Sequence, residues 1–234
     1  MRREVLAELI SARNANRTIV RATELSTGEE RLIDPAADTS SLGLAAADAA
    51  RADQSAAVEH DGSTWFLQVF NPPLELVIVG AAHIAQPLSR MAALAGYGIR
   101  IIDPRTAFAT PARFPGVSIS HDWPDEALAK APLDRRSALV ALTHDPKIDD
   151  PALTEALRSP CFYIGALGSR KTHAGRLARL RKHGFSEDEI ARIHGPVGLA
   201  IGAKSPAEIA VSILAEMTLE LRGAAVRAGT AATA

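Results

Sequence analysis

A turn of small residues at the end of an apolar segment could bind the phosphate groups of a nucleotide. The segment Leu74–Val79 runs directly into Gly80, and Ala82 and Ala85 occupy the second and third positions of the spacing G-x-G-x-x-G. In that pattern the first residue permits a tight turn, the second lets the backbone approach a pyrophosphate, and the third lets the helix pack on the strand. Ala82 adds a methyl group at the second position, which we expect to narrow or shift the phosphate site.

An acidic and a basic residue follow at the end of the next apolar segment. Asp103 stands roughly 20 residues after Gly80, where dinucleotide-binding folds place the acid that meets a ribose hydroxyl. Arg105 could instead bind a 2′-phosphate. Strand, turn, helix and strand-end acid together predict a nucleotide-binding βαβ unit over Leu74–Arg105. The alternative is a fold of this type that binds no nucleotide, because a fold alone does not establish a ligand.

A polar loop follows the apolar segment Ala138–Leu142 and holds Thr143, His144 and Asp145. Because ligands of open parallel sheets bind beyond the carboxyl ends of the strands, we expect this loop to face the glycine turn. His144 would then project where several loops converge, although a histidine in a turn can equally be a polar loop residue. No two histidines have ligand spacing on one helix, so no metal site is predicted.

A second loop, from Gly165 to Arg170, follows another apolar segment. It contains the small Gly168, the hydroxyl of Ser169 and the positive charges of Arg170 and Lys171 at a predicted helix start. Backbone N–H groups and the helix dipole make such a loop suited to an anion. The alternative interpretation is a helix cap at Ser169 with two solvated surface charges.

These residues need a parallel sheet to bring them to one edge. Apolar segments of strand length alternate with helical patterns in the second part of the chain, which predicts an α/β fold, a Rossmann-like parallel sheet with helices on both faces. The predicted strands are Leu76–Val79, Ile99–Ile102, Val117–Ser120, Ala138–Thr143 and Phe162–Leu167.

Helix starts in this region are marked by capping residues. Asp150 precedes a proline and is predicted as an N-cap, and Ser186 and Ser205 have the spacing of capping boxes. The capping box at Ser205 begins a long apolar helix, Pro206–Arg222, which is expected to end at Gly223. Core packing is its predicted role, and a homodimer contact is the alternative.

The first 73 residues are predicted to form a small α/β module, with Pro72 and Pro73 marking its end. Helices are expected at Glu4–Ala12 and Leu42–Ala52. The expected organisation is thus an N-terminal module (1–73), a Rossmann-like domain (74–223) and a flexible tail (224–234). The predicted strands of the module are Thr18–Thr23, Arg31–Asp34, Ala56–His60 and Thr64–Phe70.

Composition narrows the function classes. The 234 residues carry 26 basic and 27 acidic side chains, so no excess of positive charge points to nucleic acid or an anionic membrane. No apolar run approaches the ~20 residues that cross a bilayer. The start of the chain lacks the apolar stretch of a signal peptide. We therefore expect a soluble cytoplasmic protein with neither a nucleic-acid nor a membrane partner.

The single cysteine, Cys161, excludes an internal disulfide and cannot alone provide a structural zinc site. It precedes a predicted buried strand, which favours a buried, inert thiol. A sulfur-transfer role would require exposure and an electropositive setting.

The chain resembles the XdhC/CoxI family of accessory proteins for molybdenum hydroxylases. The resemblance covers Leu74 to Met217 in order, and its most specific motifs are THDPK, GALGSR and IGAKSPAEIAVSILAE. The matching segments are LELVIVGAAHIAQPL, DPRTAFATPARFPG, WPDEAL, ALVALTHDPKIDDPAL, FYIGALGSRKTHAGRL and GFSEDEIARIHGPVGLAIGAKSPAEIAVSILAEM.

The resemblance implies a C-terminal Rossmann-type domain that binds the molybdenum cofactor. It further implies that the protein assists sulfuration of the cofactor and its delivery to a xanthine dehydrogenase-like apoenzyme, with a cysteine desulfurase as a further partner. Such a protein is a cofactor-binding chaperone more than an enzyme. The cofactor is a phosphorylated pterin (molybdopterin), in bacteria often in a nucleotide form. The residues that match the family motifs are Gly80, Ala82, His83, Ala85, Asp103, Arg105, Thr143, His144, Asp145, Gly165, Gly168, Ser169 and Arg170.

Two departures from the family pattern stand out. The usual turn reads GAGH, whereas this chain has Ala82 at the third position of that motif. The N-terminal half usually carries an SGGC-type cysteine motif, which residues 1–73 lack. Two other functions stay open: an NAD(P)-dependent oxidoreductase, which Asp103 and Arg105 permit although no tyrosine–lysine pair follows, and a non-catalytic nucleotide-binding interaction module.

Overall fold

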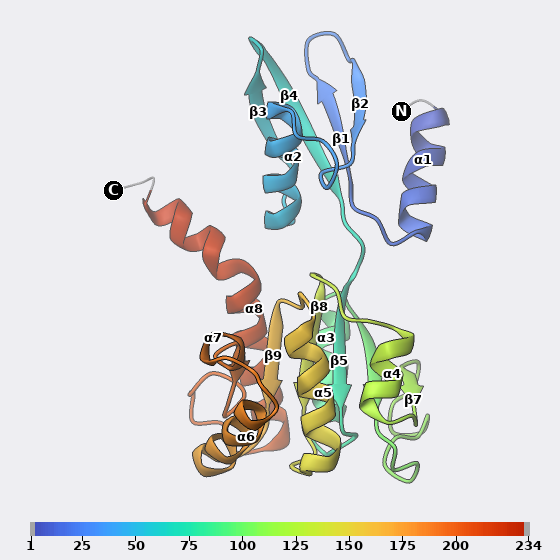
Figure 1. Cartoon of the computed structure of the whole chain (residues 1–234). Coiled ribbons are helices and arrows are strands. Elements are labelled where there is room, and N and C mark those ends of the chain that lie inside the picture. The colour runs from blue at the N-terminus through green and yellow to red at the C-terminus, as the bar shows by residue number, and fades with distance from the viewer. Residues whose placement is uncertain (1–2, 232–234) are drawn as a thin grey trace. The chain divides into compact units, whose positions relative to one another are not determined.

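The chain divides into two compact units, Met1–Pro72 and Pro73–Ala234, and the computed structural model describes residues 3–231 of it (Figure 1). Each unit has its own hydrophobic core and its own sheet.

The N-terminal unit is an antiparallel four-stranded sheet with the strand order β2-β1-β4-β3. Its inward-facing side chains, among them Val20, Trp65 and Leu67, pack with Leu42 and Ala46 of the second helix. The four predicted strands and two predicted helices are confirmed, with ends shifted by a few residues. The elements are α1 (Arg3–Asn14), β1 (Ile19–Glu24), β2 (Glu30–Ile33), α2 (Ser41–Ala52), β3 (Ala56–His60) and β4 (Ser63–Phe70).

The C-terminal unit is a six-stranded, fully parallel sheet with the order β10-β9-β8-β5-β6-β7. The five predicted strands correspond to β5–β9, and the two-residue edge strand β10 was too short for a pattern to predict. The strands are β5 (Leu74–Val79), β6 (Tyr97–Ile102), β7 (Ser118–Ser120), β8 (Ser137–Ala141), β9 (Tyr163–Ala166) and β10 (Ile193–His194). The helices are α3 (Ala85–Leu94), α4 (Pro124–Lys130), α5 (Pro146–Arg158), α6 (Arg170–Lys182), α7 (Glu187–Ile190) and α8 (Pro206–Ala231).

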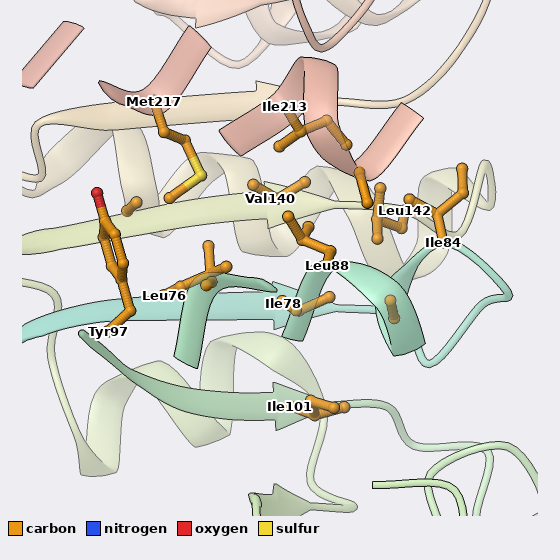
Figure 2. Close-up of a cluster of buried hydrophobic side chains, with 14 of the residues drawn as sticks. Leu76, Ile78, Ile84, Leu88, Tyr97, Ile101, Val140, Leu142, Ile213 and Met217 are labelled. Carbon is orange, nitrogen blue, oxygen red and sulfur yellow. The ribbon is translucent and has the colours of Figure 1, made fainter. Parts of the chain in front are cut away.

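Helices cover both faces of this sheet, which is why its central strands are continuously apolar. Successive side chains of a strand point to opposite faces. Leu76 and Ile78 of β5 therefore pack beneath α3 and α8, with Ile213 and Met217 of α8 closing that side (Figure 2). Side chains of the opposite parity, such as Val77, pack against α4, α5 and α6. The predicted Rossmann-like α/β fold is confirmed.

The structure corrects one predicted helix start. The helix expected to be capped by Asp150 begins one turn earlier, at Pro146, and its N-cap is Asp145, whose side chain accepts from the Lys147 amide. The same Asp-Pro pair occurs at both places in the sequence. The earlier start is favoured because the added turn buries Ile148. Pro151 is accordingly inside the helix.

A second correction concerns the end of the long helix. Helix α8 does not stop at Gly223 but continues to Ala231. A glycine costs about 1 kcal/mol in a helix relative to alanine, which the alanine-rich segment after it tolerates. The predicted tail 224–234 thus overlaps α8, and its last three residues lie outside the described part of the chain. The capping boxes predicted at Ser186 and Ser205 are both present.

Candidate functional site

The strand order creates a crevice at the carboxyl edge of the parallel sheet. β5 lies between β8 and β6. The chain leaves β5 toward α3 on one face, whereas it leaves β8 toward α5 on the other face. Such a reversal of connections is the topological switch point at which open α/β sheets bind ligands.

Gly80 brings the two sides of this crevice together. It has a φ of +100°, and a Cβ there would overlap the Thr143 methyl group. Its amide donates to the Ile102 carbonyl at 2.8 Å. Gly80 therefore serves the close approach of the turn after β5 to the loop after β8.

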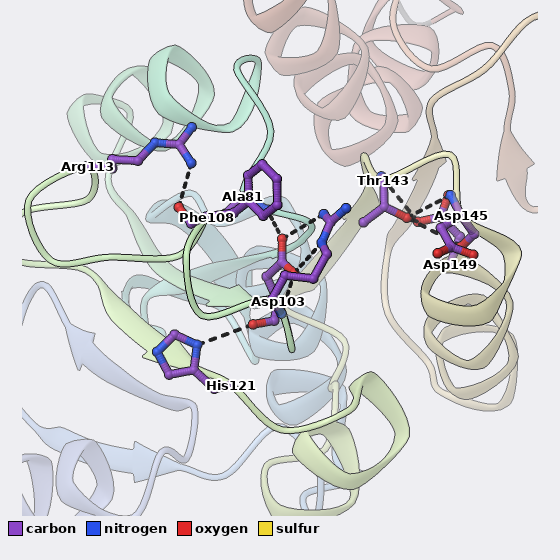
Figure 3. Close-up of polar contacts among 9 residues, drawn as sticks. Ala81, Asp103, Phe108, Arg113, His121, Thr143, Asp145 and Asp149 are labelled. Carbon is purple, nitrogen blue, oxygen red and sulfur yellow. Dashed lines mark hydrogen bonds and ion pairs between the residues drawn. The ribbon is translucent and has the colours of Figure 1, made fainter.

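The buried side chain of Asp103 supports the turn after β5. Its carboxylate is fully buried and accepts from the Ala81 amide at 2.8 Å and from Arg105 Nε and Nη2 at 2.9 and 2.8 Å (Figure 3). Burial opposes ionisation, but the bonds from Arg105 and Ala81 outweigh it, so the pKa of Asp103 lies below its ordinary value. The sequence predicts Asp103 as the acid that meets a ribose hydroxyl. In this structure its side chain instead orients Arg105 and the turn after β5.

A cavity of about 620 Å³ opens above the turn. Five of the predicted site residues line it: Ala82, His83, Arg105, Thr143 and His144. The remaining lining residues are Ala81, Ile84, Gln86, Phe108, Arg113, Leu142, Leu167, Lys204, Pro206 and Ile209. None of these described lining residues is acidic, and Arg113 and Lys204 add positive charge to that of Arg105, which Asp103 balances, so the cavity is cationic.

An aromatic ring and a second arginine stand at the cavity wall. Phe108 is 46% exposed, and the guanidinium of Arg105 lies 4.7 Å from the centre of its ring. Arg113 Nη1 donates to the Phe108 carbonyl at 2.5 Å, and Gln86 donates to the Arg113 carbonyl at 3.3 Å. These contacts hold the loop after β6 with the exposed Phe108 ring beside positive charge, and Arg105 lies over one face of that ring.

His144 has a left-handed backbone, with a φ of +63°. Its neighbours fix that turn: the Thr143 hydroxyl donates to Asp149 at 2.6 Å and accepts from the Asp145 amide at 3.0 Å (Figure 3). Non-glycine residues in this conformation are uncommon and concentrate at functional sites. The His144 side chain is exposed, and it borders both the large cavity and a smaller one beside α6.

Eight of the predicted site residues line neither cavity, and several have evident structural roles. Ser169 caps α6 by accepting from the Thr172 amide at 3.1 Å. A Cβ at Gly165 would collide with Val197 and Tyr163, so this glycine serves packing. The eight residues are Gly80, Ala85, Asp103, Asp145, Gly165, Gly168, Ser169 and Arg170.

The cavity residues Phe108, Arg113 and Lys204 were not predicted, although they lie within the family-matching segments DPRTAFATPARFPG and IGAKSPAEIAVSILAE. Arg113 and Phe108 belong to the loop between β6 and β7. Lys204 precedes the capping box at Ser205, and both that predicted helix start and the family motif around it were signals that could have singled it out. Nothing in local spacing shows that the start of α8 reaches the turn after β5.

Cys161 is buried, and burial raises the pKa of its thiol. Its sulfur is within 3.5 Å of the Ala156 carbonyl. The interpretation as a buried thiol is confirmed. No cluster of three or more His, Cys, Asp and Glu side chains suited to a metal occurs among residues 3–231. Within the same part of the chain, no helix has the length and apolar character that crossing a membrane requires.

Comparisons with curated proteins give three relatives of similar identity. The chain is 35% identical over 153 residues to YqeB and 34% over 148 residues to the molybdenum cofactor insertion chaperone PaoD, both of Escherichia coli (strain K12). It is 32% identical over 153 residues to a probable xanthine dehydrogenase subunit of Bacillus subtilis (strain 168). These matches cover 65%, 63% and 65% of this chain but 28%, 40% and 44% of the relatives, so the chain spans less than half of their length.

A solved structure and a family model agree with these relatives. A crystal structure described as a xanthine dehydrogenase from Bacillus halodurans superposes with a TM-score of 0.71 at 25% identity, covering 94% of this chain and 65% of that one. The family model of the XdhC Rossmann domain matches residues 76–217. Since that range is more than half of the chain, the protein belongs to the family that carries the XdhC Rossmann domain.

Proposed function

We propose that this protein binds the molybdenum cofactor and assists its insertion into a molybdenum hydroxylase of the xanthine dehydrogenase type. The observation that carries the proposal is the cationic cavity at the switch point, with Arg105, Arg113 and Lys204 around the exposed ring of Phe108. The relative named as a molybdenum cofactor insertion chaperone supports it.

The residues of the cavity fit a phosphorylated pterin in size and chemistry. Its volume of about 620 Å³ falls within the range of small-molecule sites. Arginine side chains recognise phosphate through charge-assisted hydrogen bonds, and an aromatic face stacks on a planar ring system. We assign the phosphate to Arg105, Arg113 and Lys204, and the pterin to Phe108. When bound, the cofactor carries the redox-active metal that the recipient enzyme uses.

Sulfuration, in this proposal, draws its sulfur from a partner such as a cysteine desulfurase. The chain has one cysteine, and Cys161 is buried with its pKa raised by burial, whereas a sulfur-transfer thiol needs exposure and a lowered pKa. The protein would then hold the cofactor while the partner acts on it.

The decisive experiment identifies the small molecules that the protein carries. We would purify it from a molybdenum-replete host, denature it, and measure oxidised pterin by fluorescence and NAD(P) by chromatography. Recovery of pterin is expected. Recovery of NAD(P) alone, together with turnover of a substrate, would contradict the proposal and favour an oxidoreductase.

Matched variants test whether the ligand binds in the cavity. Arg105→Gln and Arg113→Gln should each weaken cofactor binding roughly tenfold, because each removes a charged hydrogen-bond donor. Arg90→Gln is the control, since it removes the same charge from the exposed side of α3, outside the cavity. Equal pterin recovery from all three variants would show that the ligand does not bind in this cavity.

A further inference from the structure

A second cavity, of about 270 Å³, adjoins the candidate site and shares His144 with it. It lies between the start of α5 and the first turns of α6. None of its other residues has a part in the function proposed above. Its lining residues are His144, Pro146, Asp149, Lys171, Thr172, Gly175, Arg176 and Arg179.

Arg176 in its wall is buried with unsatisfied donors. Only 2% of the residue is exposed, and Nη2 donates to the Leu167 carbonyl at 2.9 Å. Its Nε and Nη1 have no hydrogen-bond partner within residues 3–231. Buried polar groups are nearly always paired, and an unpaired charged donor is costly. An incoming group that accepts hydrogen bonds would remove that cost.

The start of α6 supplies further donors to the same cavity. The Ser169 hydroxyl accepts from the Thr172 amide, which leaves the two amides before it, those of Arg170 and Lys171, among the helix donors without an intrahelical acceptor. The positive end of the helix dipole favours an anion there. Gly168 has a φ of +146°, and a Cβ on it would lie 3.1 Å from Thr172, so a glycine is needed where the chain turns into this helix.

The charges around the cavity leave a positive excess. Arg179 is held by Asp150 through Nε and Nη2, at 2.5 and 2.9 Å. Asp149 accepts from the Thr143 hydroxyl and faces Arg176 Nη2 at 3.6 Å. Lys171 therefore adds a charge that neither carboxylate balances.

We propose that this smaller cavity is a second anion site, for a phosphate-type oxyanion that is the second anionic group of the ligand in the larger cavity. Lys171, Arg176 and the amides at the start of α6 bind it, and His144 lies between the two groups. The assignment of both groups to one ligand rests on the proposed function. The anion site itself does not.

Inorganic phosphate tests the site directly. We would titrate the ¹⁵N-labelled chain with inorganic phosphate and follow the amide signals of residues 170–172 and 175 by NMR. Saturable shifts are expected in the wild type. Lys171→Gln should weaken binding roughly fivefold, because it removes a charged donor from the site.

Two further variants keep the test falsifiable. Lys182→Gln removes the same charge from the exposed end of α6, away from the cavity, and should leave phosphate affinity unchanged. Arg176→Lys keeps the charge and removes the fork of donors, so it should weaken phosphate binding in a protein whose NMR spectrum is otherwise native. Equal effects of Lys171→Gln and Lys182→Gln, or no saturable shifts at α6, would overturn the anion site.

The two proposals fail separately. Pterin recovered from the protein without phosphate shifts at α6 overturns the anion site and leaves the proposed function standing. Phosphate shifts that Lys171→Gln weakens, in a protein that carries no pterin, support the anion site while the proposed function fails.

Discussion

Two aspartate–arginine pairs stand at the carboxyl edge of the parallel sheet, and the fold completes only one of them. Asp103 accepts from Arg105 through both oxygens and from the Ala81 amide. Asp149 faces Arg176 at 3.6 Å. Its Oδ2 has no hydrogen-bond partner in the described part of the chain, and neither do Nε and Nη1 of Arg176.

The difference appears in the acidity of the two carboxyl groups. Burial opposes ionisation at both positions. At Asp103 the hydrogen bonds outweigh burial and the pKa is lowered, whereas at Asp149 burial dominates, despite the bond from Thr143, and the pKa is raised. The first pair is a finished structural support for the turn after β5. The second pair is where an added group can still improve the hydrogen bonding.

The largest expected effect is on stability, and matched substitutions measure it. Asp103→Asn should lower the free energy of unfolding by about 2 kcal/mol, because a neutral amide leaves part of the buried Ala81–Arg105 arrangement unpaired. Asp149→Asn should lower it by less, about 1 kcal/mol, because an amide oxygen still accepts from Thr143 and the carboxylate that faces the buried Arg176 makes no hydrogen bond to it. Urea denaturation of both variants checks the ratio. Equal losses would erase the distinction between the pairs.

The contributions of Asp103 and Asp149 to the free energy of unfolding should change with pH in opposite directions. Asp103 has a lowered pKa in the folded state, so its contribution is present above the ordinary value of 3.8 and is lost as the pH falls through the folded pKa. Asp149 has a raised pKa, so its contribution is present below the ordinary value and is lost as the pH rises through the folded pKa.

Unfolding measured at several acidic and neutral pH values tests this. The stability difference between the wild type and Asp103→Asn should grow with pH. The difference between the wild type and Asp149→Asn should shrink over the same series. Two curves of the same slope would mean that one of the two pKa directions is wrong.

The same contrast shows which contacts could be predicted from the sequence and which could not. Asp103 and the turn at Gly80 were found because a strand, a tight turn and a helix fix their spacing within one βαβ unit. Arg176 was not found, because it lies two turns into α6 and meets Asp149 only through the packing of α5 against α6. Local spacing predicts which residues end a strand. It does not predict which strands become neighbours.

The same limit applies to the ends of elements. The sequence offers Asp-Pro twice near the start of α5, and the helix begins at the first pair, where Asp145 caps it and Ile148 becomes buried. In the candidate site, His144 and Arg105 reach the cavity as the strand-end rule suggests. Asp103 follows the same rule but is buried beneath the turn, because its carboxylate is the acceptor that the Ala81 amide needs.

The smallest expected effect concerns His144, which lies between the two cavities. Its φ of +63° strains a residue with a Cβ, so His144→Gly should raise the free energy of unfolding by about 0.5 kcal/mol or leave it unchanged.

If the side chain contacts the ligand, the same variant should carry less pterin after purification and should bind inorganic phosphate more weakly. His183→Gly is a control on stability, at a residue outside both cavities with a φ of −84°. A stabilised His144→Gly protein that retains full ligand binding would show that the strained turn serves only the geometry of the Thr143 loop. Loss of binding without loss of stability would place the histidine side chain in the site, because a residue kept for folding alone cannot give that combination.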